Sequence, residues 1–88
     1  MFMEKQYVKE LIKAMSSIKD AGTFESFLHS ILTPAEFEEI PKRLQIVKLL
    51  MKGVPQREVA QKLGVGIATV TRGSRELKYG NNVFQKVL

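Results

Sequence analysis

The sequence predicts an all-α fold with about six helices, and three features lead to this prediction. Apolar residues recur every three or four positions along most of the chain, which is the spacing of amphipathic helices. No segment alternates apolar and polar residues over the length of a strand. Glycine, proline and polar capping residues separate the periodic segments. The 88 residues suffice for one small domain, whose thin core makes a second copy of the chain an expected partner.

Two amphipathic helices are predicted before residue 33. The apolar positions of the first are Tyr7, Val8, Leu11, Ile12, Met15 and Ile18. Gly22 then interrupts the pattern, and Thr23 is the predicted N-cap of the second helix. The apolar positions of the second helix are Phe24, Phe27, Leu28, Ile31 and Leu32. We interpret its aromatic rings as core residues, whereas His29 lies off the apolar stripe and is expected at the surface or at an interface.

A longer helical segment begins at residues 33–36 (TPAE). These residues combine a capping threonine, a proline suited to the first helical position and a glutamate that completes a capping box. Gly53 is suited to the C-terminal end of the segment. Pro41 lies inside it and has no backbone N–H. We therefore expect a kink or a break there, with helices at 34–40 and 42–52.

Residues 55–78 have the layout of a helix-turn-helix. Pro55 opens the first helix, and Gly64 ends it because glycine readily adopts the positive φ of a tight turn. Gly66 can cap the second helix. The apolar positions expected to hold the two helices together are Val59, Ala60, Leu63, Val65, Ile67, Val70 and Leu77. A structural helical hairpin is the alternative, but it does not need a small Ala60 at the crossing followed by a glycine.

The second helix of this motif would enter the major groove of DNA with its N-terminal residues at the base edges. Its methyl groups can contact thymine, its hydroxyls can bond a base or a phosphate, and its basic residues lie where phosphates would pass. These outward positions are Ala68, Thr69, Thr71, Arg72, Arg75 and Lys78. Gln56 and Arg57, at the start of the first helix, are predicted phosphate clamps. Each side chain alone could be a solvated surface residue, and only their common surface favours DNA.

The charge distribution also favours a polyanionic partner. The formal net charge is +5, and residues 1–52 are nearly balanced, with eight basic and seven acidic side chains. Residues 53–88 hold six basic and two acidic side chains, a bias that suits nucleic acid. A solvated basic face is the alternative explanation of the charge.

Residue types needed for catalysis are scarce. The chain has no cysteine and one histidine, which excludes a disulfide framework, a thiolate metal site and a cysteine nucleophile. No nucleophile–base set, metal-ligand spacing or phosphate-cradling loop is found. The sequence shows no membrane span or secretory signal. We therefore expect a cytoplasmic, non-enzymatic protein with no catalytic residue, no metal site, no required cofactor and no membrane partner.

The run GIATVTRGS at 66–74, with QRE at 56–58 and LTPAE at 32–36, resembles the tryptophan repressor family. The N-terminal helix and the run LKYGNN at 77–82 are similar to the YerC/YecD group of this family. The resemblance implies an intertwined all-helical homodimer with two DNA-reading heads. Within a single domain at 1–88, it implies dimerisation helices at 1–52, the helix-turn-helix at 55–78 and a short C-terminal segment at 79–88.

The resemblance also implies which residues contact DNA. Ile67, Ala68 and Thr71 would face bases, whereas most of the polar residues would approach the backbone. The complete set of predicted DNA-binding residues is Gln56, Arg57, Gly66, Ile67, Ala68, Thr69, Thr71, Arg72, Arg75 and Lys78.

A ligand pocket is implied in the same way. In tryptophan-responsive members, two arginines sandwich the indole ring, backbone carbonyls hold the ammonium group and a glycine lies beneath the ring. The matching residues, together with the glutamate that replaces a serine beside the ammonium group, are Leu32, Thr33, Arg43, Arg72, Gly73 and Glu76. Because Arg72 and Glu76 are four residues apart on one helix, we expect them to form an ion pair that competes with a ligand carboxylate. L-Tryptophan or a similar small co-repressor is therefore expected to bind weakly or not at all.

These observations predict a homodimeric, sequence-specific regulator of transcription, a repressor that binds a pseudo-palindromic operator in double-stranded DNA. The alternative is a dimeric protein-interaction module that uses the helix-turn-helix surface without specific DNA binding. The basic character of residues 53–88 disfavours this alternative, since protein-docking faces are more often apolar.

Overall fold

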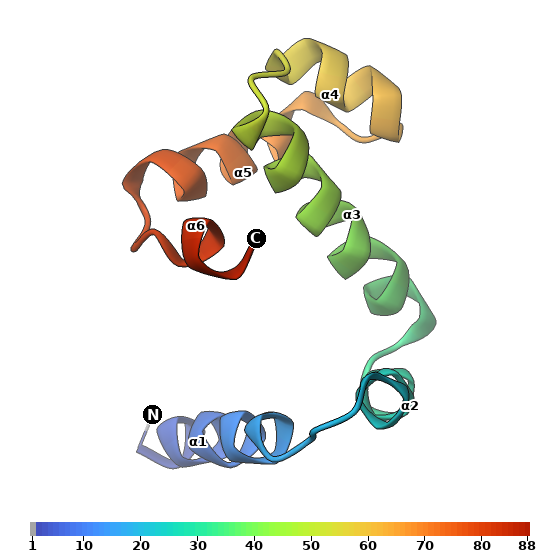
Figure 1. The fold of residues 1–88 in the computed structure, drawn as a ribbon, viewed down its shortest axis with the longest axis vertical. Helices are drawn as coiled ribbons and strands as arrows, with labels where there is room; N and C mark the ends of the chain where they lie inside the picture. The colour runs from blue at the N-terminus through green and yellow to red at the C-terminus, as the bar shows by residue number, and fades with distance from the viewer. Residues whose placement is uncertain (1) are drawn as a thin grey trace. The chain divides into compact units, whose positions relative to one another are not determined.

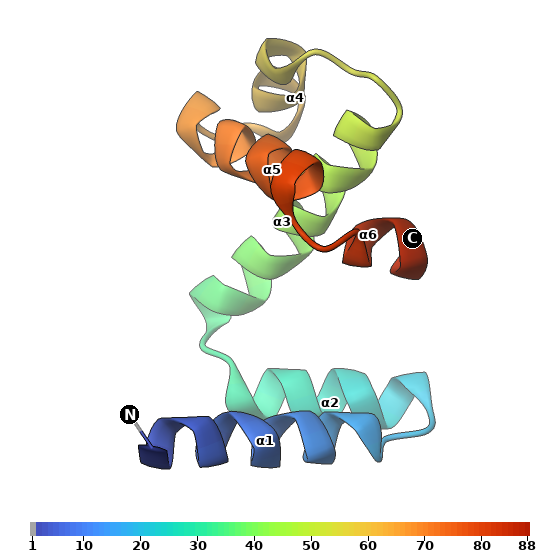
Figure 2. The same cartoon turned by 90° about the vertical axis from the view of Figure 1, so that its left-hand side faces the viewer.

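The computed structural model describes residues 2–88 and contains six α-helices and no strand within that range (Figure 1). The helices are α1 (Phe2–Ser16), α2 (Ala21–Ile31), α3 (Pro34–Met51), α4 (Gln56–Leu63), α5 (Ile67–Tyr79) and α6 (Val83–Val87). The predicted all-α class and number of helices are confirmed. The chain forms two compact units, one ending at Phe37 and the other beginning at Glu38. Helix α3 begins in the N-terminal unit and continues through the C-terminal unit (Figure 2).

The N-cap of α2 is Asp20, so the prediction of Thr23 as the cap is wrong. Asp20 has extended backbone angles (φ −117°, ψ 149°), and its carboxylate accepts a hydrogen bond from the backbone N–H of Thr23 at 2.8 Å. This bond lowers the pKa of Asp20 below its ordinary value because it stabilises the charged carboxylate. Gly22 lies inside the first turn of α2 and does not break the helix. Asp20 satisfies a first-turn N–H, which lets the helix begin three residues earlier than expected.

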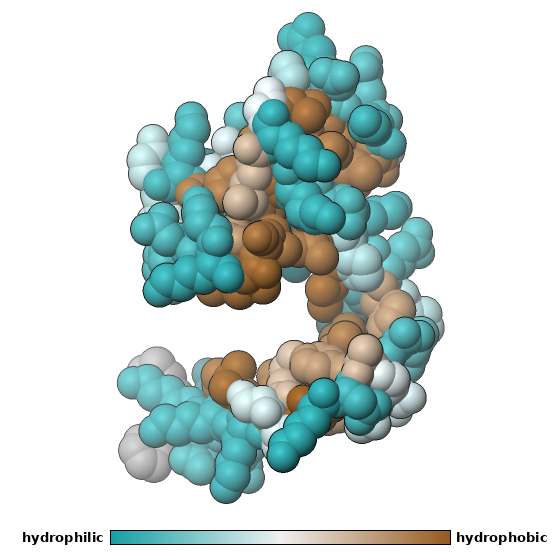
Figure 3. Space-filling view, in the orientation of Figure 1, coloured by the Kyte–Doolittle hydropathy of each residue, from teal (hydrophilic) through white to brown (hydrophobic). Residues whose placement is uncertain are grey.

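The N-terminal unit leaves much of its apolar surface exposed. Helix α2 has no buried residue, and Phe24, Phe27 and Leu28 are its half-buried residues. The exposed large apolar side chains of α1 and α2 are Tyr7, Val8, Leu11, Ile12 and Ile31. Figure 3 shows apolar surface on these helices among hydrophilic side chains. One chain by itself therefore does not bury the α2 aromatic rings as the core residues that the sequence predicts.

The predicted capping box at the start of α3 is confirmed. The backbone N–H of Thr33 donates to Glu36 Oε1 at 2.8 Å, and the backbone N–H of Glu36 donates to Thr33 Oγ1 at 3.2 Å. The first of these bonds lowers the pKa of Glu36. His29 is exposed, as expected, and its ring stacks on Phe37 with the centroids 3.8 Å apart. Glu25 Oε2 lies 3.7 Å from the Nε2 atom of His29, one helical turn away.

Helix α3 is one α-helix from Pro34 to Met51, so the predicted division into helices at 34–40 and 42–52 is wrong. Proline removes a single N–H from the hydrogen-bond ladder, the one that would bond the carbonyl of Phe37. Glu38 and Lys42 form an ion pair across this position, with Oε1 and Nζ 3.6 Å apart. Such an exposed pair contributes only about 0.2–0.5 kcal/mol. Hydrogen bonds on both sides of Pro41 therefore carry the helix through the missing bond.

The end of α3 follows the sequence prediction. Gly53 has a φ of 87°, a conformation that favours glycine. The N–H of Val54 donates to the carbonyl of Leu49 at 3.1 Å, which closes the turn that leads to α4.

The core of the C-terminal unit joins α3, α4 and α5. Ile46, Val59 and Val70, one from each helix, are buried in contact with one another. The half-buried apolar residues packed around them are Leu49, Leu50, Val54, Ala60, Leu63 and Val65. This core holds α4 and α5 as a pair and presents their outer faces to solvent.

Candidate nucleic-acid interface

A left-handed glycine forms the turn between α4 and α5. Gly64 has φ 65° and ψ 38°, and its N–H donates to the carbonyls of Ala60 and Gln61. The N–H of Val65 also donates to the carbonyl of Ala60, at 3.1 Å. These bonds satisfy carbonyls at the end of α4 and turn the chain sharply. Because Val65 packs on the core, the predicted helix-turn-helix geometry is confirmed.

Both helices of the motif begin without a side-chain cap. Pro55 precedes α4 and Gly66 precedes α5, each with extended backbone angles and no side-chain hydrogen bond to the helix. The first-turn N–H groups of a helix point out of its N-terminal end, which carries a partial positive charge. The predicted phosphate-binding residues Gln56 and Arg57 lie at this end of α4.

The predicted DNA-binding residues lie at the surface. All ten are exposed except Gln56, which is half-buried. Ile67 was also expected to hold the helices together, and this prediction is wrong because 52% of its surface is exposed. On α5, Val70 is fully buried in the core and Leu77 is half-buried. Ile67 is the first residue of α5, where the chain has only just left the turn.

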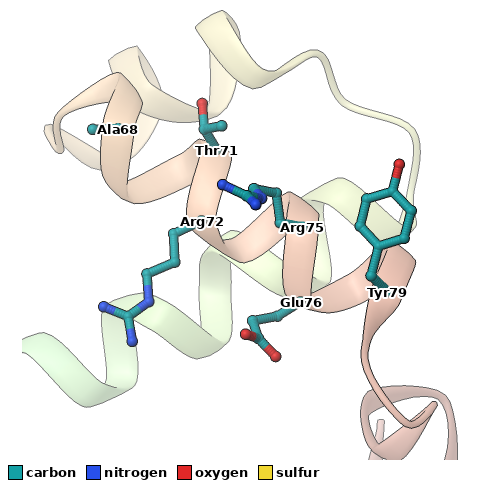
Figure 4. Close-up of a pocket in the computed structure, with 6 residues that line it drawn as sticks. All are labelled: Ala68, Thr71, Arg72, Arg75, Glu76 and Tyr79. Carbon is teal, nitrogen blue, oxygen red and sulfur yellow. The ribbon is translucent and has the colours of Figure 1, made fainter.

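A groove of about 720 Å³ lies along the outer face of α5. Its lining residues are Ala68, Thr71, Arg72, Arg75, Glu76 and Tyr79. Figure 4 shows Thr71, Arg75 and Tyr79 pointing to one side of the helix, with Arg72 and Glu76 extending from the other side. Thr71, Arg75 and Tyr79 are spaced by four residues, so they form one stripe along α5.

The sequence analysis missed Tyr79 as a member of this surface. It is 83% exposed, more than any other large apolar side chain of residues 4–88. Its spacing of eight residues from Thr71 was the signal that could have placed it on the same stripe. Its phenol group adds a neutral hydrogen-bond donor beside Arg75.

Gln56 and Thr71 are joined across the motif. Thr71 Oγ1 donates a hydrogen bond to Gln56 Oε1 at 2.9 Å, although the two residues are fifteen positions apart. A residue predicted to contact bases and a residue predicted to contact phosphate therefore share one local surface.

A second cavity, of about 530 Å³, lies between α3, α5 and α6 within the C-terminal unit. Four of the predicted pocket residues, Arg43, Arg72, Gly73 and Glu76, line it together. The apolar lining includes Ile40, Leu44 and Phe84. Leu32 and Thr33 belong to the N-terminal unit, so their part in a ligand pocket stays a prediction.

The expected ion pair between Arg72 and Glu76 is not formed. The ion pairs within residues 2–88 join Glu25 to His29 and Glu38 to Lys42. Both Arg72 and Glu76 are exposed, so water competes for each charge and weakens the drive to pair.

Gly73 has a packing role in the C-terminal unit. A Cβ atom at Gly73 would lie 3.0 Å from Cγ2 of Ile46, which is tighter than ordinary contact. The absence of a side chain on Gly73 therefore lets α5 approach α3 closely.

Comparison with known proteins establishes the family. Residues 6–88 match the family model described as Trp repressor protein. The chain belongs to the Trp repressor family. The predicted resemblance is therefore confirmed, and so is the prediction that the protein is not an enzyme, since Trp repressor family proteins are regulators.

Relatives in the Trp repressor family include Trp operon repressor homologs from two Vibrio species. The Vibrio parahaemolyticus homolog is 42% identical over 71 residues, which cover 80% of this chain and 69% of that protein. The Vibrio cholerae homolog is 44% identical over 78 residues, which cover 88% of this chain and 73% of that protein.

Two solved structures share the fold. A TrpR-like protein from Eubacterium eligens superposes with a TM-score of 0.86 and 30% identity, over 93% of this chain and 84% of that one. A putative Trp repressor from Staphylococcus aureus gives a TM-score of 0.87 and 26% identity, over 100% of this chain and 91% of that one.

No helix within residues 2–88 has the length and apolar character needed to cross a membrane.

Proposed function

We propose that this member of the Trp repressor family is a sequence-specific DNA-binding regulator of transcription that acts as a repressor. The observation that carries the proposal is the exposed stripe of Thr71, Arg75 and Tyr79 on α5, joined to the start of α4 through Gln56. Small residues at the start of α5 allow close approach to base edges, and basic residues flank them where phosphates would pass.

The charges of this surface support DNA over a protein partner. Arg57, Arg72, Arg75 and Lys78 are all exposed on α4 and α5, and Glu76 is the acidic residue of α5. A protein-docking surface would have fewer cations and a larger apolar centre. The alternative of a protein-interaction module without specific DNA binding is therefore not favoured.

A homodimer is part of the proposal. The exposed apolar residues of α1 are Tyr7, Val8, Leu11 and Ile12. Apolar surface of this kind is normally covered, and a second copy of the chain would present the same stripe in return. A two-fold dimer would also carry two helix-turn-helix motifs, which suits a pseudo-palindromic operator with half-sites about 34–36 Å apart.

We also propose that the regulator needs no cofactor and that tryptophan binds weakly or not at all. Arg43, Arg72 and Gly73 line the second cavity, as a tryptophan-like ligand would require, but Glu76 lines it too. The Glu76 carboxylate would repel a ligand carboxylate near Arg72, and its length reduces the space beside it.

Selection of duplexes from a random-sequence pool tests the proposal. The native protein should enrich a pseudo-palindromic sequence and bind it about a thousandfold or more tighter than a shuffled duplex at ~150 mM salt. Equal binding of the selected and shuffled duplexes would overturn specific regulation and favour the interaction module.

A further inference from the structure

The hydrogen bond between Thr71 and Gln56 determines which groups of this pair remain for DNA. A threonine hydroxyl has one proton and two lone pairs. Thr71 donates its proton to Gln56 Oε1 at 2.9 Å, so the hydroxyl oxygen faces a further partner only as an acceptor. The bond occupies the amide oxygen of Gln56 and neither of its two N–H donors.

The residue that carries those donors lies at the positive end of α4. Gln56 is the first residue of α4, and the preceding Pro55 provides no side-chain cap. Its amide therefore adds two N–H donors to the backbone N–H groups at that end, where an anion is favoured. Half-burial of Gln56 and the bond from Thr71 limit the orientations of the amide.

We propose that Thr71 is a positioning residue that holds the Gln56 amide so that its NH₂ group donates to a DNA phosphate. The inference rests on the proposed DNA-binding function and deepens it. With its proton committed, Thr71 faces the bases with an acceptor oxygen and a methyl group, which Figure 4 shows diverging from the same carbon. Thr71 then suits the amino group of adenine or cytosine or the methyl group of thymine, and it does not donate to guanine.

A double-mutant cycle tests the coupling on the duplex selected with the native protein. Thr71→Val removes the hydroxyl and keeps the branched shape, and Gln56→Met removes the amide and keeps the length. Each change should weaken binding about three- to tenfold, and the double variant should lose clearly less affinity than the product of the two single losses. Thr69→Val is the matched control. Its loss of DNA affinity should multiply with the loss caused by Gln56→Met, because Thr69 has no hydrogen bond to Gln56 within residues 2–88.

The free protein provides a test that does not depend on DNA. Thr71→Val should shift the side-chain NH₂ signals of Gln56 in a ¹⁵N–¹H spectrum, whereas Thr69→Val should leave them in place. Unchanged signals in Thr71→Val would overturn the hydrogen bond itself.

The outcomes separate this inference from the proposed function. If the native protein binds its selected duplex and the affinity losses of Gln56→Met and Thr71→Val multiply in the double variant, the positioning role alone is overturned. A native protein that selects no duplex would overturn the proposed function and the positioning role with it.

Discussion

At the residue scale, the basic side chains of the helix-turn-helix differ in what they can contribute to DNA binding. Arg57 lies exposed at the start of α4, and Lys78 lies exposed in the last turn of α5. Neither forms an ion pair within residues 2–88, so no acidic side chain there competes with an outside anion for either one. Contacts from such side chains to phosphates depend on charge and not on base sequence.

Neutralising Arg57 or Lys78 should reduce the salt dependence of DNA binding. Arg57→Ala or Lys78→Ala should flatten the slope of log K against log salt by roughly one unit, because one fewer counterion is released. Fluorescence anisotropy with a random duplex between about 50 and 200 mM salt measures this slope. Lys19→Ala, outside the motif, is the charge-matched control, and an unchanged slope in both motif variants would contradict the phosphate contacts.

Glu76 determines the expected response to tryptophan. Calorimetric titration should show weak or no binding to the native protein and tighter binding to Glu76→Ser, since Glu76 lines the same cavity as Arg43 and Arg72. Glu76→Gln, which keeps the bulk and removes the charge, separates repulsion from lack of space. Tight binding by the native protein that is lost in Glu76→Ser would instead mean that the carboxylate holds the ligand ammonium group.

At the scale of the element, capping residues and left-handed glycines decide where the helices of this chain begin and end. The capping box of Thr33 and Glu36 and the left-handed Gly53 and Gly64 form the helix boundaries that their residue types predict. Asp20 shows the opposite case, because its carboxylate caps α2 ahead of the expected Thr23. In each case a local hydrogen bond, available to a few neighbouring residues, selects the end of the helix.

Removing the Asp20 cap should destabilise α2 in a pH-dependent manner. The pKa of Asp20 is lowered from its ordinary 3.8 by the Thr23 N–H, so its stabilising effect is present above that pH. It is lost as pH falls through the lowered native pKa, because the protonated acid accepts this bond poorly. Asp20→Ala should therefore lower the unfolding midpoint at pH 7, and this difference should shrink as pH falls through the lowered native pKa, as followed by circular dichroism.

Asp20→Asn is the matched control for this cap. Asparagine keeps a capping oxygen without a titrating group, so this variant should remain close to the native protein at pH 7. A pH-independent effect of Asp20→Ala would mean that the carboxylate charge does not contribute.

At the scale of the whole molecule, a single chain buries few large residues. Ile46, Val47, Val59 and Val70 are the buried apolar residues of residues 4–88, and all four lie in the C-terminal unit. The N-terminal unit has no buried residue within residues 4–37. A small core of this kind offers little free energy against the conformational entropy of the chain, so a second copy is the expected source of further burial.

The protein should sediment as a dimer at micromolar concentration. Ile12→Glu should shift it towards a monomer with lower thermal stability, because a charge on the apolar stripe of α1 cannot be buried cheaply. Lys13→Glu is the control, since Lys13 lies next to the stripe but outside it. A native protein that sediments as a monomer would contradict the dimer.

The sequence by itself determined the helical class, the helix-turn-helix, the family and most of the helix ends. These features depend on periodicity and on local chemistry, such as the positive φ at Gly64 and the reciprocal bonds of Thr33 and Glu36, which neighbouring residues decide among themselves. The exposed set on α5 followed from the same periodicity, with Tyr79 as the omission.

Only the tertiary structure decided which residues distant in sequence come into contact and which of several competing local preferences prevails. The Thr71–Gln56 hydrogen bond depends on the packing of α4 against α5, which sequence spacing does not specify. Helix α3 continues through Pro41, and Arg72 and Glu76 form no ion pair within residues 2–88. Small, opposing contributions to the free energy decide each of these outcomes. These contributions depend on exposure to water and on neighbouring residues in the folded chain, so local sequence does not determine them.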